Sequence, residues 1–176
     1  EGLEVLEYAR HNKKLRTGAL SGNRFEITLR NVSDINEVAR RWYAVSEYGV
    51  PNYFGEQRFG IDGGNIERAT ALFAGQKVKD KKKRGIYLSA ARSLLFNQIL
   101  SSRIEQNIFD KIQEGDVLML AGTQSVFPLD KIDDVIEQRF IEKDVDITAA
   151  LWGAGQLMTL GEPLALEQKI SAGHQY

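Results

Sequence analysis

The stretch Pro51-Asn52-Tyr53-Phe54-Gly55-Glu56-Gln57-Arg58-Phe59-Gly60 divides the sequence into two parts with different patterns. It is dense in aromatic residues and glycine, and its apolar positions follow neither the period of a strand nor that of a helix. Just before it, Gly49 can end a helix, and Pro51 cannot continue one. We therefore predict a domain boundary here, with one domain over residues 1–48 and a second over residues 49–176.

Residues 1–48 have the pattern of two strands followed by a helix. Apolar residues alternate with polar ones in Leu3–Tyr8 and again in Phe25–Leu29, which is typical of half-buried strands. Ser33 is a good helix N-cap residue. After it, one face of an amphipathic helix is formed by Ile35, Val38, Trp42 and Val45.

Residues 49–176 have a mostly helical pattern with a few short strands. Asn65 can cap a short helix, and a long helix is predicted from about Tyr87 to Ile104. The later elements are strands at Val117–Leu120, Ser125–Leu129 and Ile147–Leu151, a helix from Asp130 to Phe140, and a last helix with Pro163 in its first turn. The fold class predicted for the whole chain is α+β.

The composition is that of a globular protein, with 43% hydrophobic and 27% charged residues. No apolar run approaches the roughly 20 residues that a membrane-spanning helix needs, so we expect no membrane association. The absence of cysteine excludes disulfides and thiolate nucleophiles and agrees with a cytoplasmic location. His11 and His174 have no ligand partner at helical spacing, so no metal site is predicted. Motifs for nucleotide phosphates and for a serine nucleophile are also absent.

A net charge of −1 hides an uneven distribution of charge along the chain. Residues 1–109 contain 18 Lys and Arg against 12 Asp and Glu, whereas residues 110–176 contain 5 against 12. The first part therefore has a net charge of +6 and the second of −7. A basic front half favours contact with a polyanion such as RNA.

Two basic clusters account for much of the positive charge. The first lies beside a glycine-rich loop and contains Arg10, His11, Lys13, Lys14 and Arg16. RNA phosphates and a solvated surface are equally good explanations of this cluster. The second, Lys77–Arg84, lies in a predicted connector and is better explained as solvated surface. For the aromatic stretch Pro51–Gly60, a packed structural hinge is favoured over a nucleic-acid site.

The sequence also resembles the TruD family of tRNA pseudouridine synthases. The stretch Gly49–Gly60 is similar to the family's signature, and Val5-Leu6-Glu7-Tyr8-Ala9-Arg10-His11 is similar to the segment that follows its catalytic motif. Further similar segments, in the same order as in the family, are Gly22–Phe25, Leu88–Gln98, Gly115–Gly122 and Ile147–Leu151. The resemblance implies part of the pseudouridine synthase catalytic domain in residues 1–48 and the family's insertion domain in residues 49–176.

The resemblance implies an activity and a partner. Family members isomerise a uridine of tRNA, at position 13 in the bacterial enzymes, to pseudouridine, and they use no metal or organic cofactor. Their catalytic Asp lies in a Gly-x-Lys-Asp motif upstream of the Val5–His11 segment, which places it before Glu1. Asp80, in Gly75-Gln76-Lys77-Val78-Lys79-Asp80, only resembles that motif and is expected to have a structural or surface role.

The remaining site residues are also implied by the resemblance. Phe25 is similar to the aromatic residue that faces the target base, and Asn23 to the Asn that orients the catalytic Asp. Contacts with phosphates are expected from Arg10, His11, Lys13, Lys14 and Arg16. We expect Asn52 and Arg58 to support the domain junction or RNA.

Two functions remain open at this point. In the first, the chain is an internal piece of a tRNA pseudouridine synthase, inactive alone because the nucleophilic Asp lies elsewhere. In the second, the chain is a non-catalytic module that binds RNA or serves as a scaffold. If the first holds, residues 1–48 lack most of their sheet, and their apolar face should be poorly covered.

Overall fold

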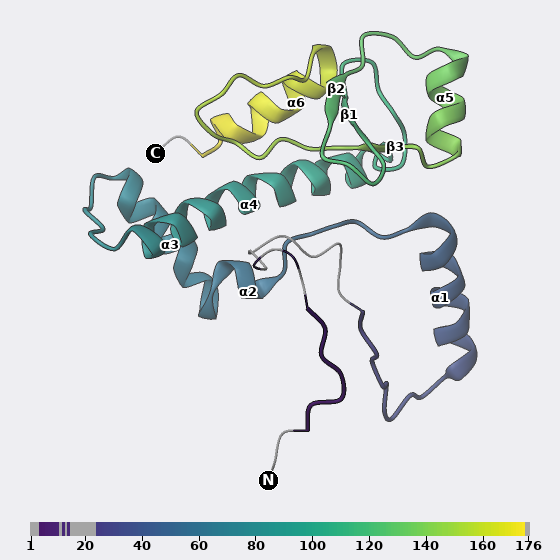
Figure 1. The fold of residues 1–176 in the computed structure, drawn as a ribbon. Coiled ribbons are helices and arrows are strands. Elements are labelled where there is room, and N and C mark those ends of the chain that lie inside the picture. Colours follow the sequence, from purple (N-terminus) through teal and green to yellow (C-terminus); the bar gives the residue numbers. More distant parts are fainter. Residues whose placement is uncertain (1–3, 11, 13, 15–23, 175–176) are drawn as a thin grey trace. The chain divides into compact units, whose positions relative to one another are not determined.

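A computed structural model describes residues 4–10, 12, 14 and 24–174, and it separates into two units, residues 1–49 and 50–176 (Figure 1). This division falls at the aromatic stretch that the sequence pattern marked. Helices and a small sheet are both present among the described residues, which confirms the α+β class. Each unit is described by itself below.

In unit 1 the described regular element is helix α1, Ile35–Tyr48. Asp34, not Ser33 as predicted, is its N-cap, because the Asp34 carboxylate accepts hydrogen bonds from the backbone N–H groups of Asn36 (2.9 Å) and Glu37 (3.1 Å). The helix ends at Gly49, as predicted, whose N–H donates to the Val45 carbonyl over 2.9 Å. The helix is thus capped at both ends by local contacts alone.

The two strands predicted in unit 1 are not formed in its described part. Residues 4–10 and 24–30 belong to no helix or strand, and most of the chain between them lies outside the described residues. An isolated strand leaves its backbone N–H and C=O groups without partners, so alternation in the sequence produces a strand only when a neighbour is available. The expected poor cover of the apolar face is confirmed, with Phe25 79%, Ile27 77% and Trp42 72% exposed.

The aromatic stretch at the start of unit 2 contains one very short helix and leads directly into a second short helical element. Helix α2 spans Glu56–Phe59, and a 3-10 helix, η1, spans Ile61–Gly63. Helix α3, Gly64–Phe73, follows directly. Its N-cap is Gly63 rather than the predicted Asn65, because the Asn65 side chain donates instead to the Arg58 carbonyl over 3.1 Å.

Helix α4, Lys81–Glu105, is the longest element of unit 2 and runs along it beside α3 and α6 (Figure 1). It starts six residues before the predicted Tyr87, because the Asp80 carboxylate caps it by accepting from the N–H groups of Lys82 (2.8 Å) and Lys83 (3.2 Å). The predicted connector Lys77–Arg84 is therefore half helix. Buried side chains on α4 include Tyr87, Ala90 and Ile99.

Within the described part of unit 2, three strands form one antiparallel sheet in the order β2-β1-β3. They are β1 (Val117–Leu120), β2 (Val126–Pro128) and β3 (Val145–Ile147). The first is as predicted, and the third is shifted from the predicted Ile147–Leu151, because Val145 at its start is buried at 1% exposure and pairs with Leu120. Leu118, at 0% exposure, lies in the central strand.

Two helices complete unit 2. Helix α5, Asp134–Ile141, packs beside β3, and the core around Leu118, Leu129 and Val145 receives Ile136 and Phe140 from this helix. Its cap is Asp133, three residues after the predicted Asp130, and Asp133 accepts from the Ile136 N–H over 2.8 Å. Helix α6, Gly161–Ala172, has Pro163 buried in its first turn, as predicted, and packs beside α4.

Candidate functional site

The aromatic stretch is held on α4 by a pair of hydrogen bonds from one side chain. The Asn97 side-chain oxygen accepts from the Phe54 N–H, and its amide donates to the Phe54 carbonyl, both over 2.9 Å. These two bonds satisfy both backbone groups of a residue that belongs to no helix or strand. The Phe54 ring also meets the Phe96 ring edge to face, with the ring centres 5.3 Å apart.

Two further residues of the stretch reach α4 at other turns of the helix. The Tyr53 hydroxyl lies 3.0 Å from the Ser101 hydroxyl, and the Arg58 guanidinium donates to the Ser89 hydroxyl over 2.9 Å. Ser89, Asn97 and Ser101 are spaced by multiples of four residues, so they lie along one stripe of the helix. The guanidinium of Arg58 also lies 5.2 Å from the centre of the Phe54 ring, a cation–π contact.

Gly60 closes the stretch in a conformation that favours glycine. Its φ is 78°, and a side chain there would meet the Asn65 side chain at 3.0 Å. Beside it, α2 and η1 surround a surface hollow of about 620 Å³ lined by Glu56, Gln57, Phe59, Gly60, Ile61, Asp62 and Gly63. Asn52 and Gln57 are exposed. The stretch therefore combines packed aromatic rings with polar side chains that remain open to a ligand.

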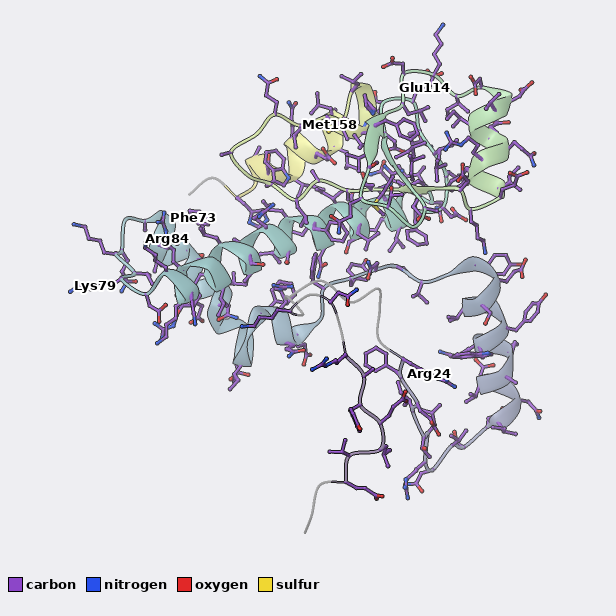
Figure 2. The ribbon with its side chains drawn as sticks, viewed as in Figure 1. Arg24, Phe73, Lys79, Arg84, Glu114 and Met158 are labelled. Atoms are coloured by element: carbon purple, nitrogen blue, oxygen red, sulfur yellow. The ribbon has the colours of Figure 1, made fainter. Side chains whose placement is uncertain are left out.

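The first basic cluster and the residues beside it are described only in part. Arg10 and Lys14 are exposed, and so are Arg24 and Phe25, which follow the glycine-rich loop (Figure 2 labels Arg24). His11, Lys13, Arg16 and Asn23 lie outside the described residues. The structure thus presents three cations and one aromatic ring of this region to solvent.

Asp80 has a structural contact, because its carboxylate caps α4 through two backbone N–H groups. Among the described residues, it belongs to no group of three His, Cys, Asp or Glu side chains. The arrangement is that of an N-cap, in which backbone N–H groups at the start of α4 engage the carboxylate.

A buried group of charged residues was not singled out by the sequence patterns. The Arg103 guanidinium pairs with both carboxylate oxygens of Asp116, over 2.6 and 2.9 Å, at side-chain exposures of 6% and 1%. The guanidinium also donates to the Lys111 carbonyl over 3.1 Å, and Asp116 accepts from the Gln113 N–H over 2.8 Å. This pair joins the end of α4 to the start of β1.

Glu167 of α6 is a second buried carboxylate nearby. Burial raises its pKa, while hydrogen bonds from the Thr159 hydroxyl (2.7 Å) and the Ala150 N–H (3.2 Å) lower it in part. In the sequence, an acidic residue on an otherwise apolar face of a predicted helix would have indicated this buried carboxylate. Both carboxylates are engaged with protein groups of unit 2, so their partners lie within the fold.

A cavity of about 670 Å³ lies between α3, α4 and the end of α6, lined mostly by apolar side chains that include Leu88, Leu95 and Trp152. None of the site residues predicted from the sequence lines this cavity. Over the described residues, no three His, Cys, Asp or Glu side chains are grouped as metal ligands. A search of the same residues found no helix with the length and hydropathy to cross a membrane.

The sequence of this chain is similar to those of known proteins of one family. The chain matches the family described as tRNA pseudouridine synthase D (TruD) over residues 1–75 and 65–175. It is 68% identical over 171 residues to the tRNA pseudouridine synthase D of Colwellia psychrerythraea, covering 97% of this chain and 47% of that protein. The corresponding protein of Shewanella oneidensis is 48% identical, with 97% of this chain and 46% of that protein covered.

The Aeromonas hydrophila protein of the same name is 44% identical, with 98% of this chain and 49% of that protein covered. The chain therefore belongs to the TruD family of tRNA pseudouridine synthases, as its resemblance implied. It spans about half the length of the curated relatives it matches.

Proposed function

We propose that this chain is part of an enzyme that isomerises a uridine of tRNA, at position 13, to pseudouridine. The observation that carries the proposal is the match over nearly the whole chain to relatives named tRNA pseudouridine synthase D, with 68% identity to one of them. A tRNA substrate and a chain without cysteine both favour the cytoplasm as its location.

We assign residues 1–48 to the catalytic domain and residues 49–176 to the insertion domain. In this proposal the nucleophilic carboxylate is not Asp80, which caps α4. It comes from the Gly-x-Lys-Asp motif that precedes the Val5–His11 segment in the family. Phe25, 79% exposed, holds one face of the flipped-out uracil, and Asn23 orients the nucleophile. Extruding the base costs a few kcal/mol, and stacking on an aromatic ring returns about 1–3 kcal/mol.

The activity is tested by release of tritium from carbon 5 of uridine-labelled tRNA. The full-length protein that contains this chain should release tritium, and residues 1–176 alone should release none. Release by residues 1–176 alone would show that the nucleophile lies within them and would overturn the assignment. Asp80→Asn should leave the release by the full-length protein unchanged, whereas abolished release would identify Asp80 as catalytic.

The role of Phe25 is tested with a matched pair of variants in the full-length protein. Phe25→Leu keeps apolar bulk but removes the aromatic face, so tritium release should slow by about 5- to 150-fold, the equivalent of about 1–3 kcal/mol of stacking. Phe25→Tyr keeps the ring and should retain most of the rate. Equal rates in the two variants would mean that Phe25 only packs.

The first basic cluster is tested by tRNA binding at several salt concentrations. Replacing Arg10, Lys13, Lys14 and Arg16 with Gln should weaken binding and flatten its dependence on salt. The slope of log K against log salt should fall by about 0.7–0.9 for each phosphate that the variant no longer neutralises. Unchanged binding and slope would assign this cluster to solvated surface.

A further inference from the structure

The second basic segment is the most strongly charged surface among the described residues of unit 2. We name it the basic turn and define it as Lys77, Lys79, Lys81, Lys82, Lys83 and Arg84. All six side chains are exposed, at the end of unit 2 where α3 leads into α4, as the labels of Lys79 and Arg84 in Figure 2 show. With Asp80 as its one acidic neighbour, the eight-residue segment has a net charge of +5 in a chain of −1.

The cations of the basic turn have no carboxylate partner within the described residues. Elsewhere in that part of the chain, Arg40 and Arg41 pair with Glu37, Arg139 with Asp144, and Arg103 with Asp116. The first turn of α4 offers no acid three or four residues further on, where the sequence has Gly85-Ile86-Tyr87-Leu88. The carboxylate within the segment, that of Asp80, is held by backbone N–H groups.

This clustering of positive charge costs free energy as long as no anionic partner is bound. Four cations, Lys81 to Arg84, occupy the first turn of α4, where the helix dipole favours anions and disfavours cations. They also repel one another, since like charges three or four residues apart on a helix destabilise it. An anionic partner would remove both penalties. Because Asp80 already occupies the N–H groups of Lys82 and Lys83, the attraction would come from the side chains.

The helical part of the basic turn also belongs to a well-anchored helix. Its last four residues belong to a helix of 25 residues that is anchored just beyond them by the buried side chains of Tyr87 and Ala90. Successive residues lie about 100° apart around a helix, so Lys81–Arg84 surround its end with positive charge. Val78 is half-buried, whereas Lys77 and Lys79 on either side of it are exposed.

We propose that the basic turn binds backbone phosphates of the RNA substrate, as a contact in unit 2 additional to the Arg10–Arg16 segment of unit 1. This inference rests on the proposed function and names a further part of its substrate-binding surface. Lysine is a point charge that suits phosphates approached from several directions. Phe73, at the end of α3 beside the turn, is 43% exposed, and a partly exposed aromatic ring beside several cations is more typical of a nucleic-acid surface than of one that binds an acidic protein.

The proposal is tested by tRNA binding to the full-length protein between about 50 and 200 mM salt. The triple variant Lys79→Gln/Lys82→Gln/Lys83→Gln should bind about tenfold more weakly, with the salt slope reduced by about 2–2.7, three phosphates at about 0.7–0.9 each. The matched control Lys111→Gln/Lys131→Gln/Lys169→Gln removes three exposed lysines from the same unit and changes the net charge equally. It should bind like wild type.

A third variant tests the opposite direction. Asp80→Asn keeps a residue that caps helices well but raises the net charge of the segment from +5 to +6, so tRNA should bind more tightly and with a steeper salt slope. Helix content by circular dichroism should stay unchanged in all three variants. Weaker binding by Asp80→Asn at unchanged helix content would contradict the proposal.

Failure of this inference can be told apart from failure of the proposed function. If wild type isomerises tRNA and the lysine triple variant binds with the wild-type slope, the basic turn is solvated surface and the proposed function stands. If the triple variant loses affinity as expected but wild type releases no tritium, the inference stands and the proposed function is wrong. If the triple variant instead abolishes self-association of the protein, the turn binds the acidic half of a second copy, which overturns the RNA assignment.

Discussion

The two units of this chain differ in what their apolar residues touch. In unit 2, Leu118 and Val145 come from different strands and are almost fully buried in one core, with α5 beside them. In unit 1, Phe25, Ile27 and Leu29 alternate as regularly as the residues of any strand, yet each is more than 60% exposed. Periodicity therefore describes which side of a segment can be buried, and a partner decides whether it is buried.

The same contrast holds for charged residues. Glu37 of unit 1 pairs with two arginines on the surface of α1, and these hydrogen bonds lower its pKa. Asp116 of unit 2 pairs with Arg103 at 1% side-chain exposure, where neither charge can be screened by water. We therefore expect similar changes to have very different effects in the two units.

The largest effect is expected from Asp116→Asn. This change leaves the buried guanidinium of Arg103 without its counter-charge, and breaking one partner of a buried pair costs about 3–5 kcal/mol. Chemical denaturation should show a much lower midpoint for unit 2. The matched change in unit 1, Glu37→Gln, breaks a solvent-exposed pair and should leave the denaturation curve unchanged. Equal shifts for the two variants would contradict the burial of the Arg103–Asp116 pair.

The second effect is a loss of packing, tested with the same substitution in both units. Leu118→Ala removes a side chain at 0% exposure and should lower the free energy of unfolding by about 2–5 kcal/mol. Leu29→Ala, at 64% exposure, should change it by less than about 0.5 kcal/mol. Urea denaturation of the 176-residue chain provides the measurement. A large loss with Leu29→Ala would mean that unit 1 has a core of its own.

The sequence predicted the elements of unit 2 because their residues find partners within the unit. Strand Val117–Leu120 and the Pro163 helix were placed correctly, since burial and local propensity agree there. Boundaries were wrong where two caps competed: Ser33 and Asp34 are adjacent, and Asp130 and Asp133 both precede α5. The choice depends on which side chain reaches the first N–H groups, a detail of geometry that composition does not carry.

For the candidate site, the sequence indicated the residues but not their tertiary contacts. The aromatic stretch stood out, but its attachment to Ser89, Asn97 and Ser101 requires the long helix to lie beside it, which no local pattern indicates. The Lys77–Arg84 segment was assigned to a connector because nothing in its composition shows that Asp80 starts the helix so early. Tertiary contacts thus decide the surroundings of residues whose types the sequence already supplies.

The third effect concerns the two aspartate caps. Asp34→Ala removes the cap of α1, worth about 1 kcal/mol, from a helix with no buried residue, so helix content should fall measurably. Asp80→Ala removes a similar contribution from α4, whose buried side chains hold the helix in place. Circular dichroism of the helical signal should therefore show the larger loss for Asp34→Ala. Asn at either position restores the cap and serves as the control.

The smallest effect is a dependence of stability on pH that comes from Glu167. Its pKa is raised by burial, so the folded chain holds this proton more tightly than the unfolded chain. The contribution of Glu167 to stability is therefore greatest below the ordinary pKa of a glutamate and falls as pH rises towards the raised value. The free energy of unfolding of Glu167→Gln, measured relative to wild type, should increase with pH across that window.

Glu167→Gln also lowers the free energy of unfolding by an amount that is the same at every pH, because its amide cannot accept from both the Thr159 hydroxyl and the Ala150 N–H. That penalty does not vary with pH, so the change of the difference with pH isolates the titration of Glu167. Glu162→Gln removes an exposed carboxylate from the same helix and should follow wild type at every pH. If the difference in free energy of unfolding between Glu167→Gln and wild type stayed constant with pH, unit 2 would have to open readily enough to hydrate the Glu167 carboxylate. Burial would then no longer distinguish Glu167 from the exposed side chains of unit 1.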